Sequence, residues 1–289
     1  MNDRDKVVAI VGSSHAESLR AMEALRSKQG VDFVLYGDRQ ETKRMAETLG
    51  IDLTGITMNH TMDTMESCKE AVIAASEGRV QVLMKGSVHT AEFLKAVLNK
   101  ELDLLPEGAL LSHIAKLTLP WYHKMLFLTD AAVSILPDLD KKVQIIINAI
   151  SVAHNLGIEN PKVALVCPVE TVNPRIVSTT DASQLVFLQK NTEAFSQAVI
   201  EGPFGLDVAL SQDAATIKGI EGEVPGDADI LVFGNIDAAN ATYKAFLSVP
   251  DVASAGIVVG AKLPIVLTSR SESMETRIAS IELALSVAP

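Results

Sequence analysis

The sequence is poor in aromatic residues and in cysteine. Aromatic residues make up 4% of the 289 residues, while 48% of all residues are hydrophobic. A sizeable core can therefore form, built mainly from aliphatic side chains. Cys68 and Cys167 are too far apart to suggest a metal-ligand spacing or a disulfide framework. We expect Cys167 to be an inert core residue and the protein to work in a reduced, cytoplasmic setting.

An excess of positive charge is also absent, because the formal net charge is −11. A general nucleic-acid binder needs a basic face, so nucleic acid is not an expected partner. The apolar runs, such as IIINAI at 145–150, are too short to span a membrane, and the first residues do not resemble a signal peptide. We expect no membrane partner. A local basic pocket for a phosphorylated ligand remains compatible with this charge.

Several well-known sequence motifs are missing. No G-x-G-x-x-G follows the first predicted strand, and neither a P-loop nor a G-x-S-x-G nucleophile elbow occurs. The six histidines include no pair at metal-ligand spacing on one helix. We therefore expect no metal site.

The chain alternates short apolar runs rich in Val and Ile with longer segments of helical period. This alternation predicts βαβ units and an α/β fold with mostly parallel sheets. Strands are predicted at Val7–Val11, Phe33–Tyr36, Val80–Met84, Met125–Leu128, Val163–Val166, Ile230–Phe233, Gly256–Val259 and Ile265–Leu267. Helices are predicted at Glu17–Ser27, Thr64–Glu77, Thr90–Leu98, Leu139–Asn155, Asp181–Gln189, Ala238–Leu247 and Glu272–Ser286. Ligands of such sheets bind beyond the carboxyl ends of the strands, so the segments there are the candidate sites.

The first candidate segment follows the strand that ends at Met84. Gly86 allows a sharp turn, and the helix after it offers free N–H groups and the positive end of its dipole to a phosphate or carboxylate. Lys85 or Lys95 could add positive charge. An ordinary βα turn with a Ser or Thr cap explains the same residues.

A second candidate segment comes near the C-terminus. Ser269 and Glu272 fit a capping box at the start of a helix. The box does not explain Arg270, because the helix dipole disfavours a cation in the first turn. An arginine there makes sense if its planar guanidinium faces an anion such as phosphate.

Two further segments have polar residues at a strand end or within an apolar run. Asn235, Asp237 and Asn240 lie at and beyond one strand end, where a helix N-cap on Asp237 would also account for them. Asp207 lies in an otherwise apolar segment and needs a partner if it is buried. It is either structural or holds a catalytic group.

From about residue 80 to the C-terminus, the chain resembles the phosphate acetyltransferase and phosphate butyryltransferase family. The order and spacing of the matching stretches are more specific than any one of them. The stretches are KGSVHTAEFLKAVL (85–98), TDAAVSILPDLDKK (129–142), PKVALVCP (161–168), EGPFGLDVAL (201–210), GDADILVFGNIDAANATYK (226–244) and VLTSRSESME (266–275).

The resemblance implies two three-layer α/β/α domains with an interdomain cleft, in a fold like that of isocitrate and isopropylmalate dehydrogenases. It places residues 1–137 plus 266–289 in a discontinuous first domain and residues 138–265 in the second. It also implies a homodimer or a higher homo-oligomer. The implied reaction converts acyl-CoA and inorganic phosphate into acyl phosphate and CoA. No metal or covalent intermediate is required, and CoA and phosphate are substrates rather than cofactors. The modest length is closer to the butyryltransferase branch.

The same resemblance assigns roles to single residues. Ser269 would interact with the CoA sulfur and Arg270 with phosphate. Lys95 falls where acetyltransferases tend to have an arginine, and Asn240 and Lys244 match the family's Asn and Lys.

The turn formed by Gly86, Ser87, His89 and Thr90 is expected to help bind the substrates. The family's proposed base, an aspartate, is replaced here by Thr276, which cannot accept a proton in this pH range. Our hypothesis is that Glu272 supplies the carboxylate, because it would share a helical face with Thr276 at the i−4 position, or that the CoA thiolate attacks without a base.

The sequence pattern is also compatible with other functions. A phosphate acetyltransferase, an acyl-CoA-binding relative without turnover and a hydrolase of acyl phosphate all fit parts of the pattern. A metal- and NAD-dependent dehydrogenase on the same fold would need acidic metal ligands and a cofactor loop, and the sequence shows neither convincingly.

Overall fold

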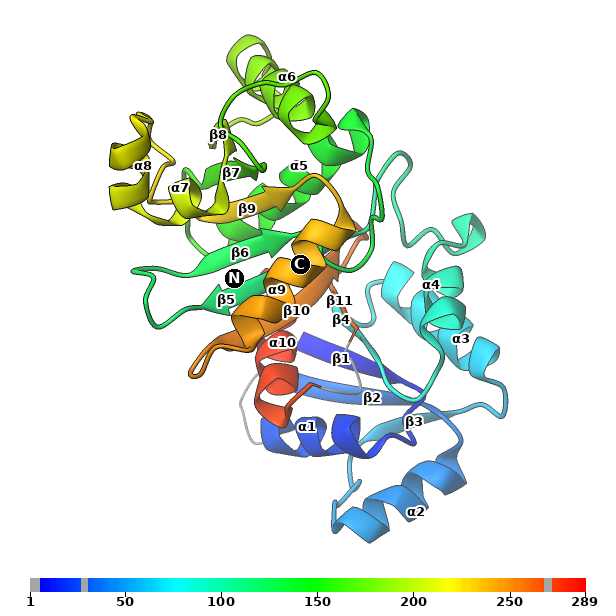
Figure 1. Cartoon of the computed structure of the whole chain (residues 1–289). Coiled ribbons are helices and arrows are strands. Elements are labelled where there is room, and N and C mark those ends of the chain that lie inside the picture. The colour runs from blue at the N-terminus through cyan, green and yellow to red at the C-terminus, as the bar shows by residue number, and fades with distance from the viewer. Residues whose placement is uncertain (1–5, 27–30, 268–271) are drawn as a thin grey trace. The chain divides into compact units, whose positions relative to one another are not determined.

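The computed structural model describes residues 6–26, 31–267 and 272–289, in which strands and helices alternate (Figure 1). The predicted α/β class with mostly parallel sheets is confirmed. The chain forms two compact units, Met1–Ala109 with Ala255–Pro289 (unit 1) and Leu110–Ser254 (unit 2). These limits differ from the domain limits expected at 137/138 and 265/266, because the two strands of residues 112–129 belong to the sheet of unit 2.

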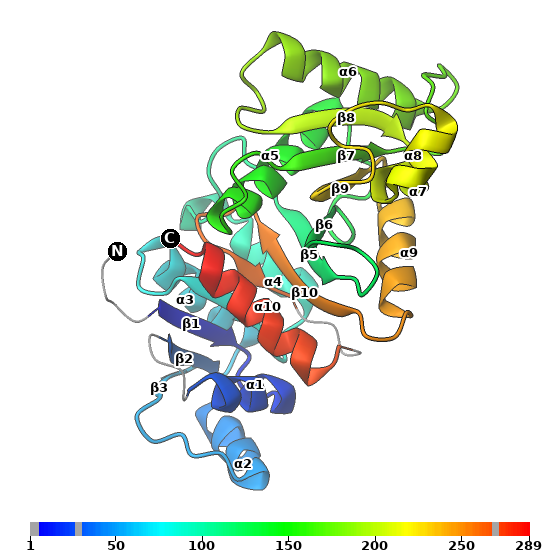
Figure 2. The ribbon, with the colours of Figure 1, turned by 90° about the vertical axis from the view of Figure 1, so that its left-hand side faces the viewer.

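Unit 1 is a sheet covered by helices on both faces. Its strands are β1 (Lys6–Val11), β2 (Val31–Gly37), β3 (Thr57–His60), β4 (Val82–Lys85), β10 (Ala253–Val259) and β11 (Ile265–Val266). The sheet order is β3-β2-β1-β4-β11-β10, and all pairs described from β3 to β11 are parallel, whereas β10 runs antiparallel to β11. The helices are α1 (Ala16–Arg26), α2 (Arg39–Leu49), α3 (Thr64–Ser76), α4 (Thr90–Val97) and α10 (Met274–Val287), with the 3₁₀ turn η1 (Lys100–Leu102). Helices α1, α2 and α10 lie on one face and α3 and α4 on the other (Figure 2).

Unit 2 repeats this layering around five strands. Its strands are β5 (Ser112–Thr118), β6 (Leu126–Thr129), β7 (Lys162–Val166), β8 (Val199–Phe204) and β9 (Ile230–Phe233), in the order β5-β6-β9-β7-β8. Only the β5–β6 pair among these is antiparallel. The helices are α5 (Leu139–Asn155), α6 (Val177–Asn191), α7 (Leu206–Leu210), α8 (Gln212–Lys218) and α9 (Ile236–Leu247). Helices α5 and α6 pack on one face, and the core beneath α7, α8 and α9 fills the other.

The sequence did not predict strands β3, β5 and β8, which are the least hydrophobic ones. Strand β3 is an edge strand whose four residues are all at least partly exposed. Strand β8 contains Pro203, which an edge strand tolerates because it donates no ladder hydrogen bond there. Helix α2 was also missed, since only Thr42 and Ala46 of its 11 residues are buried. Its ends carry clear signals, with Asp38 capping the first turn and Gly50 in the left-handed conformation that ends it.

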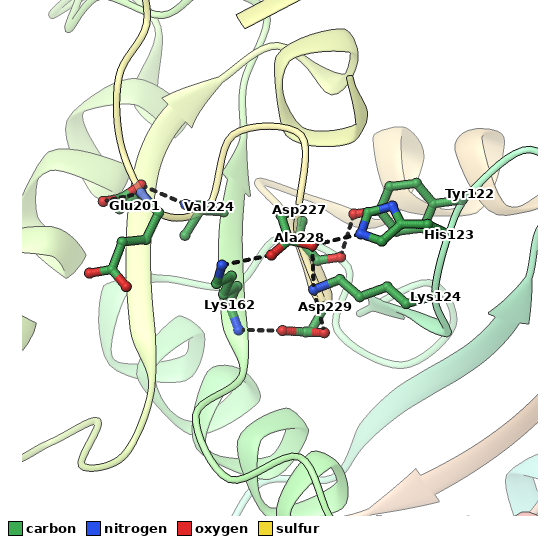
Figure 3. A network of polar contacts seen from close by, with 10 residues as sticks. Tyr122, His123, Lys124, Lys162, Glu201, Val224, Asp227, Ala228 and Asp229 are labelled. Atoms are coloured by element: carbon green, nitrogen blue, oxygen red, sulfur yellow. Dashed lines mark hydrogen bonds and ion pairs between the residues drawn. The ribbon is translucent and has the colours of Figure 1, made fainter. Parts of the chain in front are cut away.

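A charged network joins the amino ends of β7 and β9 to the loop between β5 and β6 (Figure 3). The Nζ atom of Lys124 lies 2.9 Å from a carboxylate oxygen of Asp227 and 2.9 Å from one of Asp229. Lys162 binds the same two residues, with its Nζ 2.6 Å from Asp227 and its backbone N–H donating to Asp229 over 2.8 Å. Figure 3 shows these side chains converging on the turn before β9, so the network fixes where both strands begin.

The charge state of Asp227 follows from its surroundings. Burial alone would raise the pKa of its carboxyl, but hydrogen bonds from Lys162, Lys124 and His123 outweigh that effect and hold the pKa well below its usual range. The carboxylate is therefore the form that the folded state prefers.

None of the described helices is long and apolar enough to cross a lipid bilayer. Within residues 6–26, 31–267 and 272–289, no group of three or more His, Cys, Asp or Glu side chains is placed to hold a metal ion.

We predict that Asp227→Asn lowers the free energy of unfolding at neutral pH by about 1 kcal/mol, a small effect because the side chain is 36% exposed and screened by solvent. A depressed carboxyl pKa stabilises the fold above the unfolded value of about 3.9, and this contribution disappears as the pH falls. Urea unfolding should therefore show a gap between wild type and variant that closes below about pH 4. The exposed Asp32→Asn is the matched control. A gap that stays the same at low pH would mean that the charge of Asp227 contributes nothing.

Candidate functional site

The turn after β4 is held by the end of β1. The Gly86 N–H donates to the carbonyl of Val11 over 2.7 Å, and the Ser87 N–H donates to the carbonyl of Gly12 over 2.9 Å. A Cβ atom at position 86 would lie 2.2 Å from the Gly12 carbonyl oxygen, so no side chain fits there. The sequence predicted this turn, and the reason for its glycine is the close approach of the two strand ends.

The polar side chains of this turn also serve the turn itself. The Ser87 hydroxyl donates to the Gly12 carbonyl over 3.0 Å, which leaves its oxygen lone pairs rather than its proton for other contacts. The Lys85 ammonium donates to the carbonyls of Gly86 and Val88 over 3.1 and 3.3 Å. The predicted role of Ser87 in substrate binding stays a prediction.

Helix α4 begins directly after this turn. His89 is its N-cap residue but makes no side-chain capping hydrogen bond, so its side chain satisfies none of the first N–H groups. His89 and Thr90 are exposed, and Lys95 is exposed in the last turn. Lys95 comes five positions after Thr90, about 7.5 Å further along the helix axis, and helical side chains lean toward the N-terminus. Four predicted binding residues, Gly86, Ser87, His89 and Thr90, thus share one turn, with Lys95 further along the helix.

The start of α10 differs from the prediction. Ser273 is the N-cap, and its hydroxyl accepts a hydrogen bond from the Thr276 N–H over 3.1 Å. Glu272 therefore precedes the helix instead of beginning it, and the argument that it shares a helical face with Thr276 is wrong. Ser269 and Arg270 lie outside the described residues, so their roles stay predictions.

A buried arginine that the sequence analysis missed lies in this first turn. The side chain of Arg277 is 1% exposed. Its pKa is lowered by burial, which the negative charges of Glu272 and Glu17 oppose. The carboxylate of Glu272 is therefore close enough to act on Arg277. A cation in the first turn of a helix was the available signal, the same one that drew attention to Arg270.

In unit 2, the segment after β6 is held by Asp130. Its carboxylate accepts hydrogen bonds from the N–H groups of Ala132, Val133 and Ser134 over 2.9 to 3.0 Å. The Asn240 side-chain amide donates to the carbonyl of Ala131 over 2.9 Å. Asn240 thus ties α9 to the carboxyl end of β6.

Helix α9 presents two of the predicted site residues. Asn240 and Lys244 are four residues apart and lie on one face, with Lys244 exposed. The cap of this helix is Asn235, whose side chain accepts from the Ala238 N–H over 3.0 Å, and not Asp237 as the alternative interpretation supposed. Asn235 can cap because it directly precedes Ile236, the first residue of the helix, and has an extended backbone.

His113 joins this end of unit 2 although the sequence analysis did not select it. The Thr129 hydroxyl donates to the His113 carbonyl over 2.9 Å, and the ring meets that of Tyr243 edge-on at 6.2 Å between centroids. Its Nδ1 atom is buried and has no hydrogen-bond partner among the described residues. Burial lowers the pKa of His113, opposed by the negative charge of Asp130. The imidazole is therefore neutral at pH 7.

The predicted site residues described above lie in the stretches that carry the family resemblance. The sequence profile of the phosphate acetyl/butaryl transferase family matches residues 61–285. The chain belongs to this family. Its members named phosphate butyryltransferase and phosphate acetyltransferase are acyltransferases, and this chain is an acyltransferase of the same kind.

One relative matches over the whole length of the chain. The phosphate butyryltransferase of Clostridium acetobutylicum is 40% identical over 291 aligned residues, which cover 100% of this chain and 96% of that protein. The crystal structure of a branched-chain phosphotransacylase from Enterococcus faecalis superimposes with a TM-score of 0.88 at 32% identity, covering 98% of both chains.

A more distant structure shares the fold alone. The 4-hydroxythreonine-4-phosphate dehydrogenase of Klebsiella pneumoniae superimposes with a TM-score of 0.54 at 14% identity, covering 98% of this chain and 99% of that one. This similarity agrees with the dehydrogenase-like fold that the family resemblance implied.

We predict that His113 destabilises the fold in mild acid. A histidine whose folded pKa is depressed makes the unfolded state bind the extra proton first, so stability is lost as the pH falls below about 6.5. Between pH 7 and about 5, the unfolding free energy of His113→Gln should fall less than that of wild type. The control His60→Gln, at an exposed position, should lose as much as wild type. If the unfolding free energy fell with pH equally steeply in wild type and His113→Gln, a lowered pKa of His113 would be contradicted.

Proposed function

We propose that this acyltransferase transfers a butyryl group between CoA and inorganic phosphate, converting butanoyl-CoA and phosphate into butanoyl phosphate and CoA. The observation that carries the proposal is the 40% identity to a phosphate butyryltransferase across the entire chain. Transfer of an acetyl group is the alternative, since the matching family covers both activities. The reduced interior of the cell is the proposed location, and a homodimer or higher homo-oligomer is the proposed assembly.

The proposed reaction is a direct transfer. A phosphate oxygen attacks the thioester carbonyl, the C–S bond breaks, and CoA leaves as the thiolate. Such a reaction depends on positioning and on stabilising the charge that develops on the carbonyl oxygen. In this proposal, Arg270 binds the phosphoryl group and Ser269 contacts the CoA sulfur. The first N–H groups of α4, which receive no side-chain cap, and the exposed Lys95 are proposed to support an anion as well.

The residues on α9 support the proposal from unit 2. Asn240 is held by its bond to Ala131, which leaves one amide proton and the side-chain oxygen for substrate. Lys244 supplies an exposed cation on the same face. Both residues are proposed to contact CoA or phosphate.

We expect phosphate-dependent release of CoA from butanoyl-CoA, with acetyl-CoA a poorer substrate. The measurement is thiol release from a series of C2 to C5 acyl-CoAs, with and without phosphate. No release from any of them would refute the acyl-transfer proposal, whereas faster release from acetyl-CoA would move the protein to the acetyltransferase branch.

For the reaction of CoA with acyl phosphate, we propose Glu272 as the base, because it follows Ser269, the proposed contact of the CoA sulfur, by three residues in the sequence. A thiol with a pKa of about 8.5 is only a few per cent ionised at neutral pH, so a nearby carboxylate can help to remove its proton. Ser273 caps α10, so changing Glu272 leaves the cap in place.

We predict that Glu272→Gln slows the CoA-consuming reaction by about a hundredfold or more. Glu275→Gln, which removes an exposed carboxylate three residues further on, should keep wild-type rates. Unfolding measurements on both variants separate a loss of rate from a loss of the charge interaction with Arg277. Full activity in Glu272→Gln, together with a rate that rises only as the CoA thiol ionises, would rule out Glu272 as the base. Direct attack by the CoA thiolate would then be the remaining explanation.

A further inference from the structure

Unit 2 contains a cavity that the proposed function does not use. It has a volume of about 610 Å³ and lies beyond the carboxyl ends of β7, β8 and β9. Ligand pockets typically measure about 300 to 1,000 Å³ and lie at such strand ends. Two candidate residues from the sequence, Asp207 and Asn235, line it, whereas the residues assigned to substrate binding do not. Helix α9 borders the cavity through Ala238 and Thr242, whereas Asn240 and Lys244 lie on another face of the same helix.

The charged groups at this cavity are neutralised by one another. Among the described residues that line it, Lys218 is the cation, and its Nζ lies 2.6 Å from Glu170 and 2.9 Å from Asp207. Lys142 and Asp181, which lie beside Cys167 and Ser178 in a small adjoining pocket, form an ion pair with each other. A phosphate or carboxylate would meet no surplus positive charge at these residues, so the lining favours an uncharged ligand.

The remaining lining can hydrogen-bond without charge. Ser178 and Thr242 contribute hydroxyl groups. Asn235 uses its side-chain oxygen to cap α9, which leaves its amide protons as donors. Apolar wall segments come from Leu206 and Phe233. Such a mixture suits a chain in which amides or hydroxyls alternate with aliphatic segments.

We propose that this cavity is a binding subsite for an uncharged chain of amide, hydroxyl and aliphatic groups. In an enzyme that uses CoA, the pantetheine arm has this chemistry, and this identification rests on the proposed function. A separate small molecule with the same groups is the other source of such a ligand.

The two cysteines provide a direct test. Cys167 is 7% exposed and lines the cavity, whereas Cys68 in unit 1 is 0% exposed. Methyl methanethiosulfonate should therefore modify Cys167 first, and Cys68 reports any unfolding. The probes are S-methylpantetheine, desulfo-CoA and 3′,5′-ADP, and peptide mass spectrometry measures the rate of modification at each cysteine.

S-methylpantetheine at ten times its dissociation constant should slow the modification of Cys167 about tenfold, and 3′,5′-ADP should not slow it. Protection by desulfo-CoA as well identifies the pantetheine arm of CoA, while protection by the fragment alone identifies a separate ligand. Protection by 3′,5′-ADP alone, or by none of the probes, overturns the proposal.

A matched pair of variants tests whether the ligand that protects Cys167 binds in this cavity. Ala238 is exposed at the cavity, and Ala245 is exposed on the same helix away from it. Ala238→Leu should weaken the protection by S-methylpantetheine about tenfold or more by filling space that the ligand needs, and Ala245→Leu should leave it unchanged. Equal protection in both variants would overturn the assignment to this cavity. The labelling measures binding without turnover, so its failure is distinct from a failure of phosphate-dependent CoA release.

Discussion

The close approach of β1 and β4 is the constraint on which the candidate site of unit 1 depends. Parallel strands end at a common edge, and here the N–H groups of Gly86 and Ser87 donate to the carbonyls of Val11 and Gly12 at the end of β1. The turn has no room for a side chain at position 86, so its path is fixed. That path sets where α4 begins and where its first N–H groups point. The anion-binding capacity of this segment is therefore a property of the sheet more than of any one polar side chain.

Unit 2 reaches a similar result with side chains. Asp130 holds the segment after β6 through three backbone N–H groups, and Asn240 ties α9 to that segment through Ala131. Truncating either residue would release the turn on which Lys244 and its helix depend. Buried charges elsewhere are compensated locally, as in the Lys142–Asp181 pair. Lys95 and Lys244 are exposed cations, and this suits them to meet anionic substrates.

The sequence predicted the parts of the fold that rest on strong hydrophobic patterns. Strands β1, β4 and β9 are buried along most or all of their length, and continuous runs of Val, Ile and Leu predict them. The polar edge strand β3 and the polar helix α2 gave no such signal, because neighbouring elements rather than their own burial stabilise them. The start of α10 was misplaced because two serines could each cap a helix there, and only the hydrogen bond to Thr276 distinguishes Ser273.

The sequence predicted which segments contribute to the candidate site, but it did not identify every important residue in or near them. Strand ends located the turn at Gly86 and helix α9, because ligands of parallel sheets bind there. The half-buried His113 and the buried Arg277 could not be selected in this way, since their importance comes from their position beside charges that are distant in the sequence.

The central claim, direct transfer between CoA and phosphate, is tested most directly by isotope exchange. Labelled CoA is incubated with butanoyl-CoA and the enzyme, and the label in butanoyl-CoA is followed over time. Direct transfer predicts exchange only when phosphate is present, because the acyl group must pass to phosphate and back. Exchange at the same rate without phosphate would show that the acyl group rests on the protein, and would contradict the account.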